Sequence, residues 1–198
     1  MPPSNSVEIG AHATATLKYI RASMEAATAL AVPGSAGFAI GMLGLLATAL
    51  SSAPALQVHW LVIWLVAAVA AAVLGGLLML QRSSLQGLAL CGAPLRKFML
   101  CLLPSLFGGA VMTAVLWVSG NLHAIPGTWL LLYGCALISA SVPTTSVIAI
   151  MGSLFVALGL VAFALPDSLQ VAMLGVGFGG LHLLFGFIIG RTSHVGQA

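Results

Sequence analysis

His182 is the residue of this sequence best placed for chemistry inside a membrane. It stands in the apolar stretch Leu169–Gly190, nine residues before Arg191. If that stretch is a membrane helix, His182 lies about 13 Å from its charged end, close to the bilayer midplane. Ionisable side chains at that depth are costly and usually face the bundle interior or a cavity. His182 is therefore a candidate proton relay, haem or metal ligand, or substrate contact. The alternative is structural, a neutral imidazole hydrogen-bonded to another helix.

Two more histidines, His59 and His123, fall near the ends of predicted helices. Imidazoles can bind copper or zinc and can serve as axial haem ligands. These two lie in different connections, and neither belongs to a histidine or cysteine motif with metal-ligand spacing. The alternative for both is an ordinary histidine at a membrane surface. His182, His59 and His123 are thus the candidates for cofactor binding, with no cofactor identified and no metal site predicted.

The scarcity of acids argues against ordinary acid–base catalysis. The chain has three, Glu8, Glu25 and Asp167. A serine–histidine–acid triad and an intramembrane protease both need more polar partners than this around one buried histidine. The sequence also has no glycine-rich loop of the kind that cradles phosphate. These features favour a non-enzymatic protein and give no catalytic residue.

The composition predicts a polytopic membrane protein. Hydrophobic residues make up 61% and charged residues 5% of the 198 residues, whereas a soluble domain is about half apolar and about a quarter charged. The six bases are scattered and form no stripe, so we expect no nucleic-acid partner. The predicted fold is an all-α integral membrane bundle of six transmembrane helices, preceded by a cytoplasmic amphipathic helix.

Six apolar stretches are long enough to be considered as membrane spans. The first and fourth are short against the ~20 residues that cross ~30 Å of hydrocarbon. The fourth must borrow Pro126-Gly127 or lie in locally thinned bilayer. The predicted spans are Ala36–Ser52, Val58–Leu80, Phe98–Val118, Thr128–Ser141, Thr145–Leu165 and Leu169–Gly190.

The N-terminal region is predicted to lie outside the bilayer. Residues 1–10 are expected to be a disordered tail, and residues 11–32 an amphipathic interfacial helix. Arg21 and Glu25 stand at i and i+4 on its polar face and can form an ion pair. Residues 33–191 then form the six-span domain, and residues 192–198 a cytoplasmic tail.

The six bases all fall on one side of this threading. The positive-inside rule makes that side cytoplasmic, so both termini are expected in the cytoplasm of a cell whose inner membrane holds the protein. The opposite ends of the spans carry most of the tryptophans, which prefer a membrane interface. These are Trp60, Trp117 and Trp129.

Glycines recur at i and i+4 in the first and sixth spans, the spacing that lets bilayer helices approach closely. We therefore expect these two spans to be central, tightly packed helices. The predicted packing positions are Gly37, Gly41, Gly175, Gly179, Gly186 and Gly190.

An internal duplication is a further possibility that the sequence leaves open. Phe107-Gly-Gly in the third span is repeated as Phe178-Gly-Gly in the sixth. Two halves of three spans each would have inverted topology, as in many transporters. Glycine pairs are frequent in this chain, however, and Gly75-Gly76 has no such counterpart.

Three segments carry a resemblance to a known group of proteins. They are Tyr19–Glu25 followed by Val32-Pro33-Gly34, then Pro126–Gly134, and Gly177–Gly186. In these segments the chain resembles uncharacterised small six-span bacterial integral membrane proteins, a family with no named activity. The resemblance covers most of the chain and implies the same fold, but it brings no catalytic residues.

Three functions follow as hypotheses from the sequence. The first is a non-enzymatic accessory protein that acts through helix contacts, as a homo-oligomer or with a partner membrane subunit. The second is a small oligomeric transporter or channel with His182 near the path. The third is a haem- or metal-binding membrane protein. In all three the lipid bilayer is the immediate surrounding.

Overall fold

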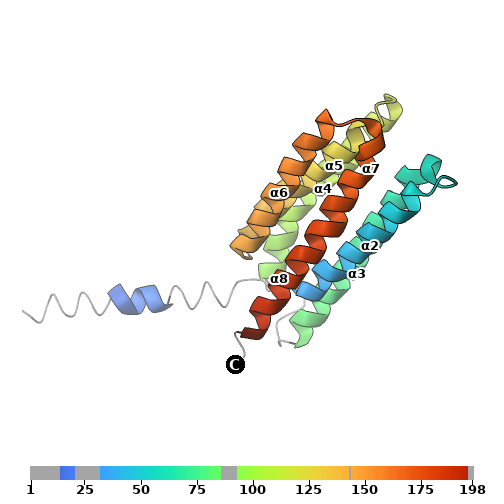
Figure 1. Cartoon of the computed structure of the whole chain (residues 1–198). Coiled ribbons are helices and arrows are strands. Elements are labelled where there is room, and N and C mark those ends of the chain that lie inside the picture. Colours follow the sequence, from blue (N-terminus) through green and yellow to red (C-terminus); the bar gives the residue numbers. More distant parts are fainter. Residues whose placement is uncertain (1–13, 21–31, 86–92, 143, 196–198) are drawn as a thin grey trace, which may run out of the picture.

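The computed structural model of the chain describes residues 14–20, 32–85, 93–142 and 144–195. Nearly all of these residues are helical, and no strand occurs in the described ranges. Six helices are long and apolar enough to cross a membrane. The predicted all-α bundle is therefore confirmed, and the chain is a multi-pass membrane protein (Figure 1).

Five of the six membrane-spanning elements are single α-helices, and the sixth is assembled from three consecutive pieces. This sixth element runs from α7 through a π-helix, η2, into α8. The elements are α2 (Gly34–Ser52), the short 3₁₀ helix η1 (Gln57–His59), α3 (Trp60–Leu85), α4 (Ala93–Val118), α5 (Ala124–Ser141), α6 (Ser146–Ala164), α7 (Asp167–Leu174), η2 (Gly175–Leu181) and α8 (His182–Val195).

Residues 14–20 also form a helix, inside the range 11–32 predicted to be amphipathic. The predicted ion pair of Arg21 with Glu25 lies outside the described residues.

Two helices begin a full turn or more before the start that the hydropathy pattern predicted. α5 starts at Ala124 rather than Thr128, and α4 starts at Ala93 rather than Phe98. Each early start places a proline in the first turn of the helix, where its missing N–H would have had no intrahelical acceptor. The extra turn brings the short fourth span to 18 residues.

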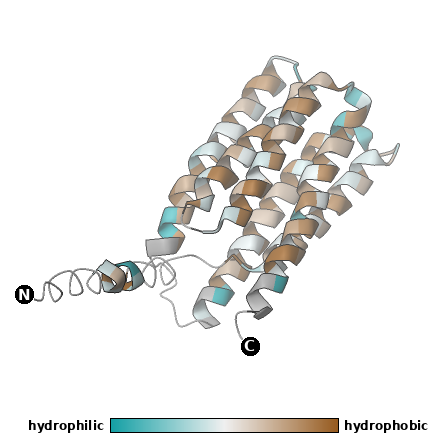
Figure 2. Cartoon of the chain, turned by 60° about the vertical axis from the view of Figure 1, so that its left-hand side comes forward, coloured by the Kyte–Doolittle hydropathy of each residue, from teal (hydrophilic) through white to brown (hydrophobic). Residues whose placement is uncertain are grey.

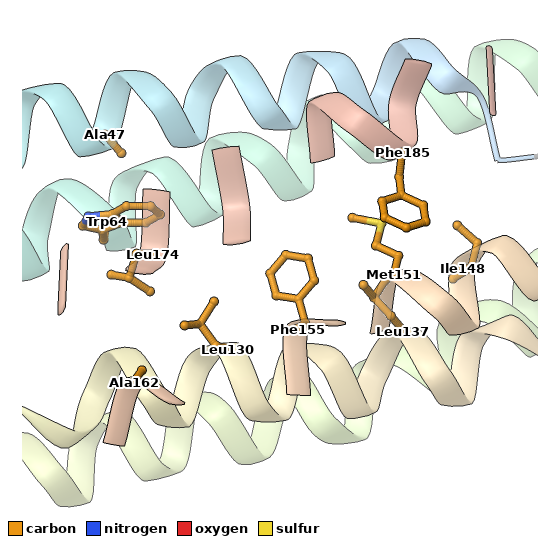
Figure 3. Close-up of a cluster of buried hydrophobic side chains, with 10 residues drawn as sticks. All are labelled: Ala47, Trp64, Leu130, Leu137, Ile148, Met151, Phe155, Ala162, Leu174 and Phe185. Carbon is orange, nitrogen blue, oxygen red and sulfur yellow. The ribbon is translucent and has the colours of Figure 1, made fainter. Parts of the chain in front are cut away.

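The helices form two layers of three. In one layer α2 packs between α3 and α8, and in the other α5 packs between α4 and α6. Figure 1 shows α4, α5 and α6 on one side of the bundle and α2 and α3 on the other, with the α7–α8 rod next to both groups. Buried side chains from the two layers meet between them (Figure 3); they are Ala47, Trp64, Leu130, Leu137, Ile148, Met151, Phe155, Ala162, Leu174 and Phe185.

Glycines bring backbones together within each layer. A Cβ added to Gly34 of α2 would lie 2.5 Å from the carbonyl oxygen of Gly186 in α8. In the other layer, a Cβ on Gly134 of α5 would lie 2.6 Å from the carbonyl oxygen of Gly152 in α6. Both pairs of helices therefore pack backbone against backbone, an arrangement that larger residues would prevent.

The two ends of the bundle differ in composition. One end, here called the tryptophan end, holds the connections that follow α2, α4 and α6, together with Trp60 and Trp117. The other, the terminal end, holds the start of α2 and the end of α8. The described bases of the bundle lie toward the terminal end: Arg82, Arg96, Lys97 and Arg191. Figure 2 shows the most hydrophilic positions near helix ends and hydrophobic colours along their middles.

Candidate functional site

His182 lies in the interior, at the boundary between the two layers. It is the first residue of α8 and is 3% exposed. Its Nε2 atom lies 2.8 Å from the hydroxyl oxygen of Tyr133, which belongs to α5 in the opposite layer. This hydrogen bond joins α8 to α5 and is the central polar contact of the candidate site.

Aromatic rings enclose the histidine. The ring of Phe155 from α6 meets the imidazole edge-on at 5.4 Å between centroids, and the ring of Phe178 from η2 stacks on it at 6.1 Å. Tyr133 packs against both phenylalanines at 4.9 and 5.0 Å. Trp64 of α3 extends the cluster through Phe178, at 5.8 Å. Such tilted and edge-on pairs are the favourable arrangements of aromatic rings.

The hydrogen bonds around His182 favour one tautomer. Its Nδ1 atom is buried and makes no hydrogen bond of good geometry to the described residues, although the backbone carbonyls of Gly177 and Phe178 lie close to the ring. The backbone carbonyls beside the ring are available acceptors for a proton on Nδ1, and with the proton there Nε2 accepts from the Tyr133 hydroxyl. We therefore assign His182 as a neutral imidazole with Nε2 as acceptor.

The π-helix before His182 is rich in glycine. Four of its seven residues are glycine. A Cβ on Gly175 would lie 2.6 Å from Thr48 of α2, whereas a Cβ on Gly177 would lie 2.5 Å from Leu130 of α5. The segment is thus closely packed against both layers. π-Helical turns are rare and frequently occur at functional sites.

The other two candidate histidines lie at the tryptophan end. His59 is exposed in η1. His123 is exposed just before α5 and lines a separate pocket with Trp60, Asp167 and Gln170. Within the described ranges, no three His, Cys, Asp or Glu residues are grouped so that they could hold a metal ion.

Five of the six predicted packing glycines lie at close helix contacts, whereas a Cβ added to Gly190 would meet nothing within 4 Å. Gly37 and Gly41 of α2 face α8, where their nearest neighbours are Gly186 and Leu183. Gly175 and Gly179 face Thr48 and Leu45 of α2. The backbone of Gly190 is the neighbour of Gly34.

Tyr133 and Phe155 are the functional candidates that the sequence pattern did not single out. They stand 49 and 27 positions from His182, and nothing local connects them to it. One signal was available for Tyr133, because only two tyrosines occur in the chain and Tyr133 alone lies inside a predicted span. A buried tyrosine hydroxyl requires a partner, and a buried histidine can provide one.

The hydroxyl-rich connection between α5 and α6 satisfies its own backbone. Ser141 donates to the carbonyl oxygen of Ile138 at 2.6 Å, and Thr144 to that of Ala140 at 2.9 Å. Local hydroxyls of this kind satisfy carbonyls freed at a helix end.

No family model matches this chain, and no curated protein or solved structure matches it either.

Proposed function

We propose that this protein is a small membrane transporter that moves protons, alone or together with a solute, along a path that includes His182. The observation that carries the proposal is the hydrogen bond from Tyr133 to His182 across the two layers, next to a π-helix. Histidine is the side chain whose charge changes most readily near neutral pH. Buried ionisable groups inside membrane bundles commonly belong to ion or proton pathways.

The packing supports movement of one layer against the other. Within each layer, backbones touch at glycines, as in the pairs Gly34–Gly186 and Gly134–Gly152. Between the layers, the contacts are made largely by side chains such as Phe155 and Leu130. Side chains can change rotamer, whereas close backbone contacts cannot change without separating the helices. Each layer is therefore expected to move as a unit, so that His182 becomes accessible from alternate ends.

The pairing of helices also fits an inverted repeat. In the first half α2 packs against α3, and in the second half the corresponding α5 packs against α6. The third helix of each half packs against the first helix of the other half, since α8 contacts α2 and α4 contacts α5. Exchange of this kind between two inverted halves is a common construction of transporters, with the site at the interface of the repeats.

The same proposal includes an orientation. The bases near the terminal end support a cytoplasmic location for that end by the positive-inside rule, and a bacterial inner membrane is the membrane we propose. Both termini are then cytoplasmic, and the tryptophan end faces outward.

A flux measurement tests the transport proposal. Purified protein is reconstituted into liposomes that contain a pH-sensitive dye, and an imposed pH gradient is followed with and without a counter-ion ionophore. We expect the wild type to dissipate the gradient faster than empty liposomes. The His182→Gln variant, which keeps a polar side chain but cannot exchange protons near neutral pH, should lose this activity. His59→Gln is the matched control, because His59 is an exposed histidine outside the cluster.

The proposal fails if wild-type liposomes are as tight to protons as empty ones, or if the His182→Gln variant keeps full flux. Circular dichroism and gel filtration of the variant show whether a loss of flux merely reflects misfolding.

A second function, as a helix-interaction or accessory protein, is favoured by glycines that face outward. A Cβ added to Gly76 of α3 or to Gly108 of α4 would meet nothing within 4 Å. Glycine in a bilayer helix is typical of a contact with another helix. Cross-linking in native membranes tests this, since Gly108→Leu should remove a homo-oligomeric or partner cross-link while leaving the fold intact.

A further inference from the structure

A pocket opens at the tryptophan end of the bundle. It has a volume of about 180 Å³ and is lined by Trp60 of α3, His123 and Pro126 around the start of α5, and Asp167 and Gln170 of α7. Gln170 precedes His182 by twelve residues, which is about 18 Å along a helix. Pockets for drug-sized ligands begin at about 300 Å³, so a ligand of this pocket has few heavy atoms.

Gln170 brings a buried acceptor to the pocket wall. The side chain is 6% exposed, and its Nε2 donates to the carbonyl oxygens of Ala162 at 2.7 Å and Leu165 at 3.1 Å. These bonds fix the amide, because rotating it would set an oxygen against two carbonyls. Oε1 is therefore directed away from α6, and it has no hydrogen-bond partner among the described residues. A buried amide oxygen normally has a donor.

The remaining polar groups of the pocket also attract a cation. Asp167 contributes an exposed carboxylate at the first position of α7. Trp60 contributes an indole ring, whose face attracts ammonium groups. The described lysine and arginine residues of the bundle lie toward the other end, which leaves His123 of the same lining as the base nearest to Asp167 in the described pocket. The pocket lining thus combines a negative charge, an aromatic residue and, behind its wall, a buried amide oxygen that has no hydrogen-bond partner among the described residues.

We propose that this pocket binds the ammonium group of a small amine. Asp167 pairs with its charge, and Trp60 packs against its carbon atoms. Gln170 Oε1, which is buried behind the pocket wall, accepts one of its N–H groups after the wall opens slightly. Two sources carry such a group at a membrane surface, namely a dissolved amine and the ethanolamine headgroup of a lipid. The site is separate from the proposed transport path and does not depend on it.

Equilibrium binding of labelled ethanolamine to the full chain in nanodiscs of phosphatidylglycerol tests the proposal. We expect saturable binding that weakens as salt is added, because Asp167 is exposed and its charge is screened. Asp167→Asn should weaken binding about tenfold or more, in line with the loss of a charge-assisted hydrogen bond. Ser168→Ala, the neighbouring exposed position outside the pocket lining, is the matched control and should bind normally.

The lipid of the nanodisc distinguishes the two sources. If a lipid headgroup fills the pocket, labelled ethanolamine binds more weakly in phosphatidylethanolamine nanodiscs than in phosphatidylglycerol ones. If a dissolved amine is the ligand, the affinity is the same in both. Each result supports an ammonium site and identifies its occupant.

Asp167 also stabilises the positive N-terminal end of its helix, which is its purely structural role. That role alone predicts no saturable ethanolamine binding by the wild type, and this result would overturn the proposal. Undiminished binding by Asp167→Asn would overturn it as well. A third contrary result is zinc binding that is lost in both Asp167→Asn and His123→Ala while ethanolamine does not bind, since the pocket would then hold a metal.

Discussion

The hydroxyl oxygen of Tyr133 and Nε2 of His182 lie 2.8 Å apart at the boundary between the two helix layers. Tyr133 belongs to α5 and His182 to α8, so the bond connects the central helix of one layer to an outer helix of the other. Phe155 and Phe178 pack around it and exclude other polar groups from the ring faces. A structural role and a transport role for His182 would both depend on this hydrogen bond.

Removing the tyrosine hydroxyl should destabilise the bundle modestly. In Tyr133→Phe the ring packing stays, but Nε2 of His182 loses its donor in an apolar interior. Hydrogen bonds between membrane helices are worth about 0.5–2 kcal/mol, and we expect a loss of unfolding free energy in that range, measured by titration with a denaturing detergent. Tyr19→Phe is the control, because Tyr19 is 74% exposed. Equal stability of Tyr133→Phe and wild type would show that the bond contributes nothing.

The same variant tests the assigned tautomer. Nitrogen NMR of histidine-labelled protein should show His182 with a protonated Nδ1 in the wild type. In Tyr133→Phe the resonance of the unprotonated Nε2 should shift, because its hydrogen bond is gone. A wild-type signal from a protonated Nε2 would contradict the assignment.

Glycines in different membrane helices should differ sharply in their tolerance of substitution. Gly152→Leu places a Cβ 2.7 Å from the carbonyl oxygen of Gly134, so α5 and α6 must separate. We expect the loss of several helix contacts and a large drop in folded yield. Gel filtration and thermal unfolding measure these effects. Gly108→Leu is the matched control, since a Cβ there meets nothing within 4 Å. Similar behaviour of the two variants would mean that the α5–α6 contact is wrongly placed.

The number and nature of the helices could be predicted from the positions of the apolar stretches along the chain. Long apolar stretches separated by bases and prolines leave few other folds for this chain, and six candidate spans are present. Helix starts were harder to predict, because Pro126 sits in the apolar pattern as a breaker and becomes acceptable only as part of a first turn. The π-helix was also missed, since glycine pairs predict close packing without specifying the backbone hydrogen bonds.

The candidate site was only half predictable. His182 stands out because it is an ionisable residue in an apolar stretch. Its partner depends on which helix lies opposite, and that is decided by the fit of many small and large side chains along two layers. The pocket of Asp167 and Gln170 was out of reach for the same reason, because it joins connections that are distant in sequence.

The contact between α4 and α5 should depend on one threonine. Nε1 of Trp129 donates to Oγ1 of Thr113 at 2.7 Å, while Thr113 itself donates to the carbonyl oxygen of Gly109 at 2.7 Å. Thr113→Val keeps the shape but leaves the indole N–H without an acceptor, so we expect a loss of about 0.5–2 kcal/mol. Thr113→Ser keeps the hydroxyl and should stay close to wild type. If both variants lose the same stability, the methyl group and its packing matter more than the hydrogen bond.

Cysteine labelling tests the proposed orientation. Ser119 is exposed in the connection after α4 at the tryptophan end, and Ser84 is exposed in the last turn of α3 at the terminal end. In a background without Cys91, Cys101 and Cys135, a membrane-impermeant maleimide on intact cells should label Ser119→Cys. Ser84→Cys should react only after the membrane is opened, because the proposed orientation puts the end with the bases in the cytoplasm. The reverse pattern would place the termini outside. Labelling of both sites on intact cells would indicate a mixed orientation. Four bases at one end of the described bundle make a mixed orientation energetically unfavourable.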